Sequence, residues 1–167
     1  MKTAQTLVAV VLFAALVAPA ALAASGKVGE KVTDFELKDV DGKLVKSAEF
    51  RKDKAYVIKF GATWCPPCNR QISELNKVVE EYGDKVAVLD VDVREPAEKV
   101  KAHAKKTGIK YKVVLDADGA VAKDYGVRGI PVVIVADKDG KVLYSGHYTK
   151  YEVLKKHLDA ALAEKTE

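Results

Sequence analysis

A pair of cysteines between a strand-like run and a helix-like stripe is the feature that most constrains the fold of this chain. The run Tyr56–Phe60 is rich in residues that favour β-structure, and it leads directly to the sequence WCPPC at positions 64–68. Apolar side chains then recur every three or four positions, at Cys68, Ile72, Leu75, Val79 and Tyr82. The pattern therefore predicts a strand, a turn that holds both cysteines, and an amphipathic helix.

The chain has only two cysteines, Cys65 and Cys68, so we expect them to act together. Two sulfurs at this spacing can form a disulfide that opens and closes, or they can contribute two ligands to a soft metal. A tetrahedral zinc site needs four ligands, and the sequence has neither a second cysteine pair nor a His-x-x-x-His pattern. A static disulfide that closes so short a loop would stabilise the fold little. We therefore expect a redox-active disulfide, with no metal and no other cofactor.

The helical stripe predicts different roles for the two sulfurs. Cys68 shares the apolar face and should be shielded, whereas Cys65 precedes the first full turn, where unpaired N–H groups and the helix dipole favour a thiolate. A lowered thiol pKa makes Cys65 the expected nucleophile, and Cys68 would resolve the mixed disulfide. Pro66 and Pro67 have no N–H and a fixed φ, so they should stiffen the loop and remove two donors near the sulfur. Trp64 is expected either to pack over the helix start or to contact substrate as a surface ring.

The rest of the chain alternates between strand and helix patterns. Strands are predicted at Val86–Val91, Tyr111–Leu115, Val132–Val135 and Val142–Tyr144, and helices from Pro96 to Gly108, over Ala120–Tyr125 and near the C-terminus. The last helix should begin with a capping box of Thr149 and Glu152, and its apolar face should include Val153 and Leu162. Three Asp-x-Asp-Gly segments fit turns better than calcium loops, because each lacks the further ligands of such a loop. The order of elements predicts one α/β domain with a mixed central sheet between helices.

The first 23 residues have the pattern of a signal peptide. Lys2 supplies a positive charge, residues 7–17 form a short apolar core, and ALA at positions 21–23 is a small-x-small cleavage site. We therefore expect export, with cleavage near Ala23 and the folded domain in residues 24–167. A retained N-terminal membrane anchor is the alternative. An oxidising compartment such as the periplasm would suit a cysteine pair that forms a disulfide.

The residues around the cysteines resemble the active site of the thioredoxin superfamily. Residues 59–68, KFGATWCPPC, are similar to its active-site strand and helix start, and residues 126–131, GVRGIP, are similar to its cis-proline loop. An added strand and helix between Val93 and Asp124, together with an N-terminal β extension, resemble TlpA/ResA-type exported thiol-disulfide oxidoreductases. The resemblance covers nearly all of residues 24–167 and implies a thioredoxin-like α/β fold, with a central mixed β-sheet flanked by helices.

The resemblance also implies a reaction on protein substrates. Cys65 would attack a substrate disulfide, Cys68 would resolve the intermediate, and Ile130 with a cis Pro131 would hold the substrate chain beside the sulfur. Reduction is the implied direction, which requires a membrane electron donor. We expect a monomer. We expect no nucleic-acid binding, because the charge of +4 is spread along the chain. The alternatives are a disulfide-forming oxidant, a thiol peroxidase, which Ala62 in place of a threonine disfavours, and a copper- or haem-carrying protein.

Several residues depart from the patterns of this family. Lys59 stands where thioredoxins carry a buried acid that assists the resolving cysteine. It could favour a Cys68 thiolate by pointing inward, but an outward orientation is expected, because an unpaired buried lysine is costly. Gln71 stands where haem-maturation members carry a glutamate, and Ser73 and Val132 also differ from that pattern. Lys59 and Gln71 are therefore candidates for tuning the redox pair, and these departures put a role in cytochrome c maturation in doubt.

Overall fold

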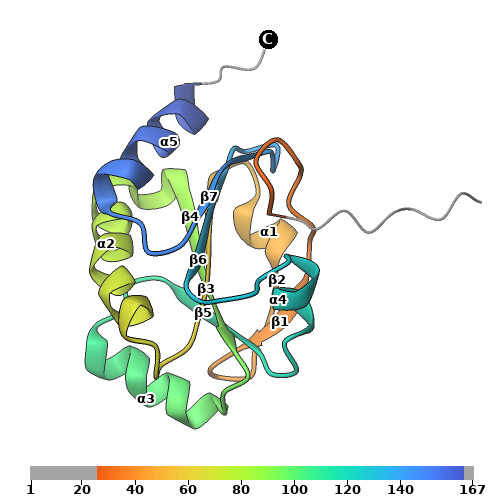
Figure 1. Ribbon diagram of the computed structural model, residues 1–167, viewed down its shortest axis with the longest axis vertical. Helices are drawn as coiled ribbons and strands as arrows, with labels where there is room; N and C mark the ends of the chain where they lie inside the picture. Colours follow the sequence, from red (N-terminus) through yellow and green to blue (C-terminus); the bar gives the residue numbers. More distant parts are fainter. Residues whose placement is uncertain (1–25, 164–167) are drawn as a thin grey trace, which may run out of the picture.

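The segments predicted as strands lie side by side in one seven-stranded mixed sheet with helices on both faces (Figure 1). This computed structural model describes residues 26–163. The strands are β1 (Glu36–Asp39), β2 (Leu44–Lys46), β3 (Ala55–Gly61), β4 (Val86–Val93), β5 (Lys112–Asp116), β6 (Val132–Ala136) and β7 (Val142–Gly146). The helices are α1 (Ser47–Arg51), α2 (Pro66–Tyr82), α3 (Ala97–Thr107), α4 (Ala120–Asp124) and α5 (Tyr151–Ala163), with a 3-10 turn at Gly83–Lys85.

The predicted signal peptide lies outside the described residues. Among residues 26–163, no helix combines the length and the apolar character needed to cross a membrane.

β3 and β4 occupy the centre of the sheet, whose strand order is β2-β1-β5-β4-β3-β6-β7. Every residue of β3 is buried, as expected for a strand covered on both faces. β3 runs parallel to β4, with α2 as the crossover between them, and antiparallel to β6. The predicted hairpin of β6 and β7 is confirmed. The predicted N-terminal β extension is also confirmed, because β1 and β2 pair with each other and β1 continues the sheet beyond β5.

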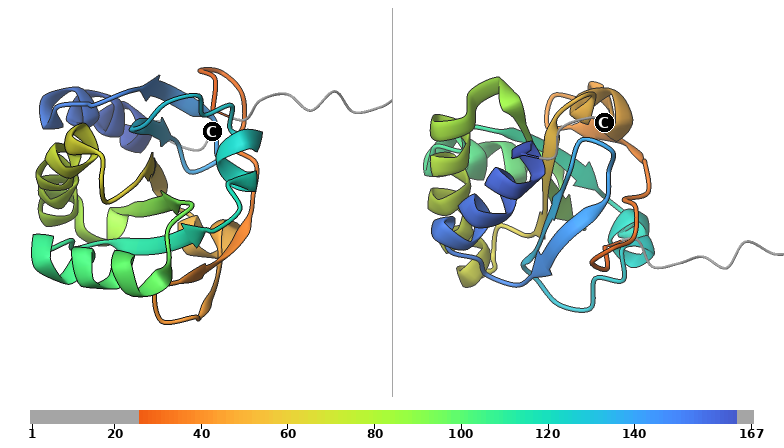
Figure 2. Two further views of the ribbon diagram at one scale, coloured as in Figure 1. Left: turned by 60° about the horizontal axis from the view of Figure 1, so that its bottom comes forward. Right: turned by 90° about the horizontal axis from the view of Figure 1, so that it is seen from above.

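Different helices cover the two faces of the sheet. α2, α3 and α5 lie on one face, and α1 and α4 lie on the other (Figures 1 and 2). Alternate residues of β3 point to opposite faces, so Val57 belongs to the apolar cluster that includes Leu75 of α2, whereas Ile58 belongs to the cluster that includes Ala122 of α4. The sequence periodicity of α2 is explained by this packing, which seats the helix that carries the cysteines against the central strands.

The predicted turns at the Asp-x-Asp-Gly segments are confirmed. Asp39 and Asp137 each accept hydrogen bonds, through Oδ1, from the backbone N–H groups two and four positions later. The carboxylate of Asp116 accepts two N–H groups at the start of α4. These side chains therefore stabilise turns and a helix start, as their spacing suggested.

The start of α5 differs from the predicted capping box. The helix begins at Tyr151, and the hydroxyl of Thr149 donates to the carbonyl oxygen two residues earlier at 2.7 Å instead of capping the helix. Glu74 of α2 accepts the backbone N–H of Tyr151 at 2.9 Å. Val153 and Leu162, predicted on the apolar face, are exposed. The prediction was wrong because a carboxylate from another helix supplies the cap, and this contact is not visible in the local sequence.

Candidate active site

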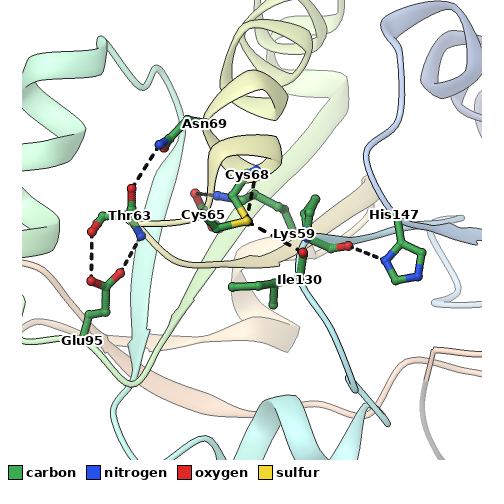
Figure 3. Close-up of a disulfide and its surroundings, with 10 residues drawn as sticks. Lys59, Thr63, Cys65, Cys68, Asn69, Glu95, Ile130 and His147 are labelled. Carbon is green, nitrogen blue, oxygen red and sulfur yellow. Dashed lines mark hydrogen bonds and ion pairs between the residues drawn. A yellow bond between two sulfur atoms is a disulfide. The ribbon is translucent and has the colours of Figure 1, made fainter.

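The two cysteines lie where β3 ends and α2 begins, as predicted, and their sulfurs form a disulfide (Figure 3). Cys65 is the N-cap residue of α2, and Pro66 and Pro67 occupy the first two helical positions. The backbone N–H of Cys68 donates to Sγ of Cys65 at 3.3 Å. Since proline has no N–H, the third helical residue is the first that can donate to this sulfur. Opening the disulfide would therefore leave the Cys65 thiolate stabilised by the helix start.

The cis-proline loop packs directly against Cys65. The Ile130–Pro131 peptide bond is cis, which confirms what the resemblance implied. Sγ of Cys65 lies 3.8 Å from the carbonyl oxygen of Ile130. On the other side of the loop, Nδ1 of His147 lies 2.9 Å from the carbonyl oxygen of Pro131 and links the loop to the end of β7 (Figure 3). In the oxidised protein both Cys65 and Cys68 are buried.

A buried carboxylate fixes the residue that precedes the redox motif. Glu95, in the segment after β4, accepts the backbone N–H of Thr63 at 2.5 Å and its hydroxyl at 2.9 Å (Figure 3). Asn69 of α2 donates to the carbonyl oxygen of Thr63 at 3.0 Å. Burial acts to raise the pKa of Glu95, but hydrogen bonds from Lys99 and Thr63 hold it below its usual value. Both sides of the Thr63 backbone are thus held, and the adjacent Trp64 takes the exposed orientation, with 67% of its surface accessible.

Lys59 is buried, so the prediction that it points outward was wrong. Its Nζ lies 2.7 Å from Oδ2 of Asp90, and both side chains are almost fully enclosed. The two residues are direct partners in the parallel pairing of β3 with β4, which supplies the counter-charge that the prediction assumed to be absent. A Cβ placed on Gly61 would lie 2.9 Å from Nζ of Lys59 and 3.3 Å from Sγ of Cys68. The ammonium group and the buried sulfur therefore both lie beside Gly61, and the lysine side chain leaves no room for a side chain at that position.

Two further buried acids, Asp90 and Asp92, were missed as site residues by the reasoning from sequence. Burial, reinforced by the charges of Glu95 and Asp90, raises the pKa of Asp92 to about 8. At neutral pH Asp92 is therefore mostly protonated. The spacing of the two acids in β4 carried a signal, since alternate residues of a strand share a face. Both acids consequently lie on the same face as Lys59.

Gln71 lies fully buried on α2, one turn beyond the cysteines. Its Nε2 donates to the carbonyl oxygen of Thr149 at 2.8 Å, and its Oε1 accepts the backbone N–H of Thr149 at 2.7 Å. Both ends of the amide are therefore used to join α2 to the segment before α5. The structure shows this positioning contact, and an effect of Gln71 on the redox pair stays a prediction.

Comparisons with known proteins agree with this geometry. A model of the AhpC/TSA family matches residues 28–145. Thiol-disulfide oxidoreductase ResA of Bacillus thuringiensis subsp. konkukian is 33% identical over 130 residues, which cover 76% of this chain and 75% of that protein. ResA of Geobacillus thermodenitrificans is 34% identical over 136 residues, which cover 80% of this chain and 77% of that protein.

Solved structures show the same fold. A thiol:disulfide interchange protein of the thioredoxin family from Chlorobium tepidum aligns with a TM-score of 0.71 at 28% identity, covering 83% of this chain and 100% of that one. The thioredoxin-like fold and the ResA-type resemblance predicted from the sequence are confirmed.

Proposed function

The chain belongs to the AhpC/TSA family and is a thiol-disulfide oxidoreductase, and from this premise we propose that it reduces disulfides in exported client proteins. The observation that carries the proposal is the position of Cys65. Its sulfur caps a helix start and lies 3.8 Å from the carbonyl oxygen of Ile130 in the cis-proline loop. A client sulfur that reaches Cys65 would therefore bring its own backbone against the loop, where strand-like pairing can hold it.

The proposed reaction proceeds through one mixed disulfide. The Cys65 thiolate of the reduced protein attacks one sulfur of the client disulfide, and the other client sulfur leaves as a thiolate that takes up a proton. The Cys68 thiolate then attacks Sγ of Cys65 and releases the first client sulfur as a second thiolate. Two electrons pass to the client, and the Cys65–Cys68 disulfide forms again. Trp64, which directly precedes Cys65, and Ile130, whose carbonyl oxygen lies near its sulfur, are proposed to contact the client segment.

Pro67 supports the reducing direction. Strong oxidants of this chemistry owe their high potential to a stabilised reduced form, which means a well-stabilised thiolate. An N-cap side chain usually accepts from the second or third helical N–H, and Pro67 removes the donor at the second position. Within residues 26–163, the N–H of Cys68 is the one hydrogen-bond donor to Sγ of Cys65. A less stabilised thiolate gives up its electrons more readily, as a reductant should.

Export is proposed from the signal-peptide pattern of residues 1–23 together with the disulfide chemistry. A reductant in an oxidising compartment becomes oxidised and must be reduced again, so a membrane electron donor is part of the proposal. The mass of the mature protein recovered from the producing cell tests the cleavage site. A chain that starts at Ala24 supports export by cleavage, and a chain that retains residues 1–23 contradicts it.

The function is tested by trapping the mixed disulfide. In the Cys68→Ser variant the second step cannot occur, so client proteins should stay covalently attached to Cys65 and be released by dithiothreitol. The Cys65→Ser variant is the matched control and should trap none. Equal trapping by both variants, or by neither, would contradict the proposed roles.

The direction is tested by the equilibrium potential of the Cys65–Cys68 pair. A value near that of thioredoxin, about −270 mV, is expected, and a value near that of strong periplasmic oxidants, about −120 mV, would overturn reduction. The rival peroxidase activity is tested separately with hydrogen peroxide. Faster peroxide consumption by the wild type than by Cys65→Ser would favour that rival.

A further inference from the structure

A cleft of about 590 Å³ begins beside the redox motif. Its walls are formed by Trp64, by the end of β4 with the residue after it, by helix α4 and by the cis-proline loop. Ile130 lines the cleft and also carries the carbonyl oxygen that lies 3.8 Å from Sγ of Cys65. Residues that flank a client cysteine bonded to Cys65 would therefore lie in or beside this cleft.

The charged side chains that line the cleft are all positive. They are Arg94, Lys123 and Arg128, and no carboxylate lines the cleft with them. All three are exposed, and none of them forms an ion pair with another described residue. Asp118 directly precedes Gly119, which lines the cleft, but the carboxylate of Asp118 accepts the N–H of Ala120 at the start of α4. The three cations therefore place positive charge next to the disulfide, and no carboxylate among residues 26–163 pairs with them directly.

Arg94 is held in place by the backbone around it. It has a φ of 61°, in the left-handed region that costs energy for a residue other than glycine, and its N–H donates to the carbonyl oxygen of Asp116 at 3.0 Å. Its Nε donates to the carbonyl oxygen of Asp118 at 3.2 Å. A Cβ on Gly119 would approach Nε to 2.5 Å, so the absence of a side chain there leaves room for the guanidinium.

The terminal amino groups of Arg94 are left without a hydrogen-bond partner among residues 26–163. A guanidinium fixed through Nε retains these N–H groups for a carboxylate and loses little side-chain freedom when it binds one. The N–H groups of Arg94 are therefore available to a carboxylate, and Lys123 and Arg128 line the same cleft.

We propose that this cationic cleft selects client segments that carry aspartate or glutamate beside the reactive cysteine. The proposal rests on the proposed function and adds a substrate class to it. The occupant is an extended acidic peptide segment of the client, placed with its cysteine at Cys65 and with a carboxylate at Arg94. Charge complementarity of this kind raises the rate of encounter and sets the orientation of the bound chain.

The test uses three peptides, each with one cysteine followed by three glutamates, three glutamines or three lysines. Each cysteine is joined by a disulfide to 2-mercaptoethanol, which is uncharged. The reduced protein attacks the peptide sulfur, mercaptoethanol leaves as a thiolate, and Cys68 then releases the peptide thiol, so that two electrons reach the probe. The rate for each peptide is divided by its rate with dithiothreitol, which removes differences in intrinsic reactivity.

At low ionic strength the wild type should prefer the glutamate peptide over the glutamine peptide by about 10-fold, and the lysine peptide should react most slowly. Arg94→Gln should lower this preference about threefold, and the variant with Arg94, Lys123 and Arg128 all replaced by glutamine should bring it close to one. Lys156→Gln removes an exposed lysine of α5 outside the cleft and should leave the preference unchanged. Because the ratio compares two peptides on one protein, a change in the reactivity of Cys65 cancels.

The proposal is overturned if the wild type shows no preference, or if the triple variant keeps it. If the triple variant does not fold, the salt dependence of the wild type provides the test. Raising the salt from about 10 mM to about 500 mM should abolish a preference that is due to exposed charges. A preference that survives at high salt overturns the proposal. Exchange with the glutamine peptide reports on the proposed function by itself. A reduced protein that reacts with none of the three peptides contradicts that function and the cleft proposal together.

Discussion

The sheet face that α2 and α5 cover has an apolar end and a charged end. Where α2 and α5 cover the sheet, the buried side chains of the face are apolar, as at Val57, Leu75 and Leu158. Toward the carboxyl ends of β3 and β4, the same face carries Lys59 and Asp90, paired at 2.7 Å, and then Asp92. The switch from apolar to charged side chains occurs within two residues along each strand and coincides with the approach to the disulfide.

On this face of the sheet, the side chains that favour folding by apolar burial lie at one end, and the charged side chains near the disulfide lie at the other. Burying apolar surface favours folding, whereas burying ions costs desolvation that a partner offsets only in part. The intact charged end is therefore expected to add little to the free energy of unfolding. Removing one of its charges is expected to lower that free energy much more. Because it lies next to Cys68, an effect of this end on the electrostatics of the redox pair stays a prediction. Three substitutions test this division between the two ends.

Asp90→Ala should be the most damaging of the three. It leaves the ammonium group of Lys59 buried without its ion-pair partner, and the free energy of unfolding should fall by about 3–5 kcal/mol. Urea unfolding at pH 7 measures the loss. Leu75→Ala at the apolar end is the matched change and should cost about 2–5 kcal/mol through lost burial and a cavity. A loss below about 1 kcal/mol for Asp90→Ala would show that the lysine does not depend on Asp90.

Asp92→Asn should change how stability depends on pH. The pKa of Asp92 is raised to about 8 in the folded protein, above its value in the unfolded chain. Between about pH 4 and pH 8 the native state therefore binds more protons than the unfolded state, and its stability falls as pH rises. Asparagine cannot ionise, so the variant should lose this slope, a difference of roughly 1–3 kcal/mol between pH 5 and pH 8.

Urea unfolding of wild type and variant at the two pH values is the measurement for Asp92. The exposed Asp84 provides a control, since Asp84→Asn should leave the slope as it is in the wild type. If the free energy of unfolding of Asp92→Asn depends on pH as in the wild type, other groups cause that dependence. The titratable neighbours of Asp92 are Glu95, Asp90 and His103.

The smallest effect on stability is expected from replacing the whole ion pair. Lys59→Met combined with Asp90→Leu removes both charges and keeps similar side-chain volumes, so the free energy of unfolding should stay within about 1 kcal/mol of the wild-type value. Comparison with the two single variants in a double-mutant cycle isolates the coupling between the residues. A loss of several kcal/mol in the double variant would mean that the charged end stabilises the fold by itself.

Much of the fold and the redox motif could be predicted from the sequence, because both depend on patterns of residues that are close together in the chain. Residues a few positions apart form each of these patterns, which are the β-prone run before the cysteines, the apolar stripe of α2 and the Asp-x-Asp-Gly turns. The cis-proline loop is predicted from a family resemblance that rests on six consecutive residues. Cys65 consequently lies at the start of α2 where the helical stripe placed it.

The contacts that could not be predicted join residues far apart in the chain. Lys59 and Asp90 are 31 positions apart, and their pairing depends on the register of two strands. The same holds for Gln71 with Thr149, 78 positions apart, and for the cationic cleft, whose walls come from four segments. Lysine was expected to point outward because no partner was visible, and the partner is set by strand register, which periodicity does not fix.

Trp64 gives this protein a built-in optical reporter. It is the only tryptophan in the chain, it directly precedes Cys65, and two-thirds of its surface is exposed. Indole fluorescence from the folded protein therefore originates at the redox motif alone. Opening of the disulfide and arrival of a client segment both alter the surroundings of this ring, so each can be followed by emission in stopped-flow measurements without an attached dye.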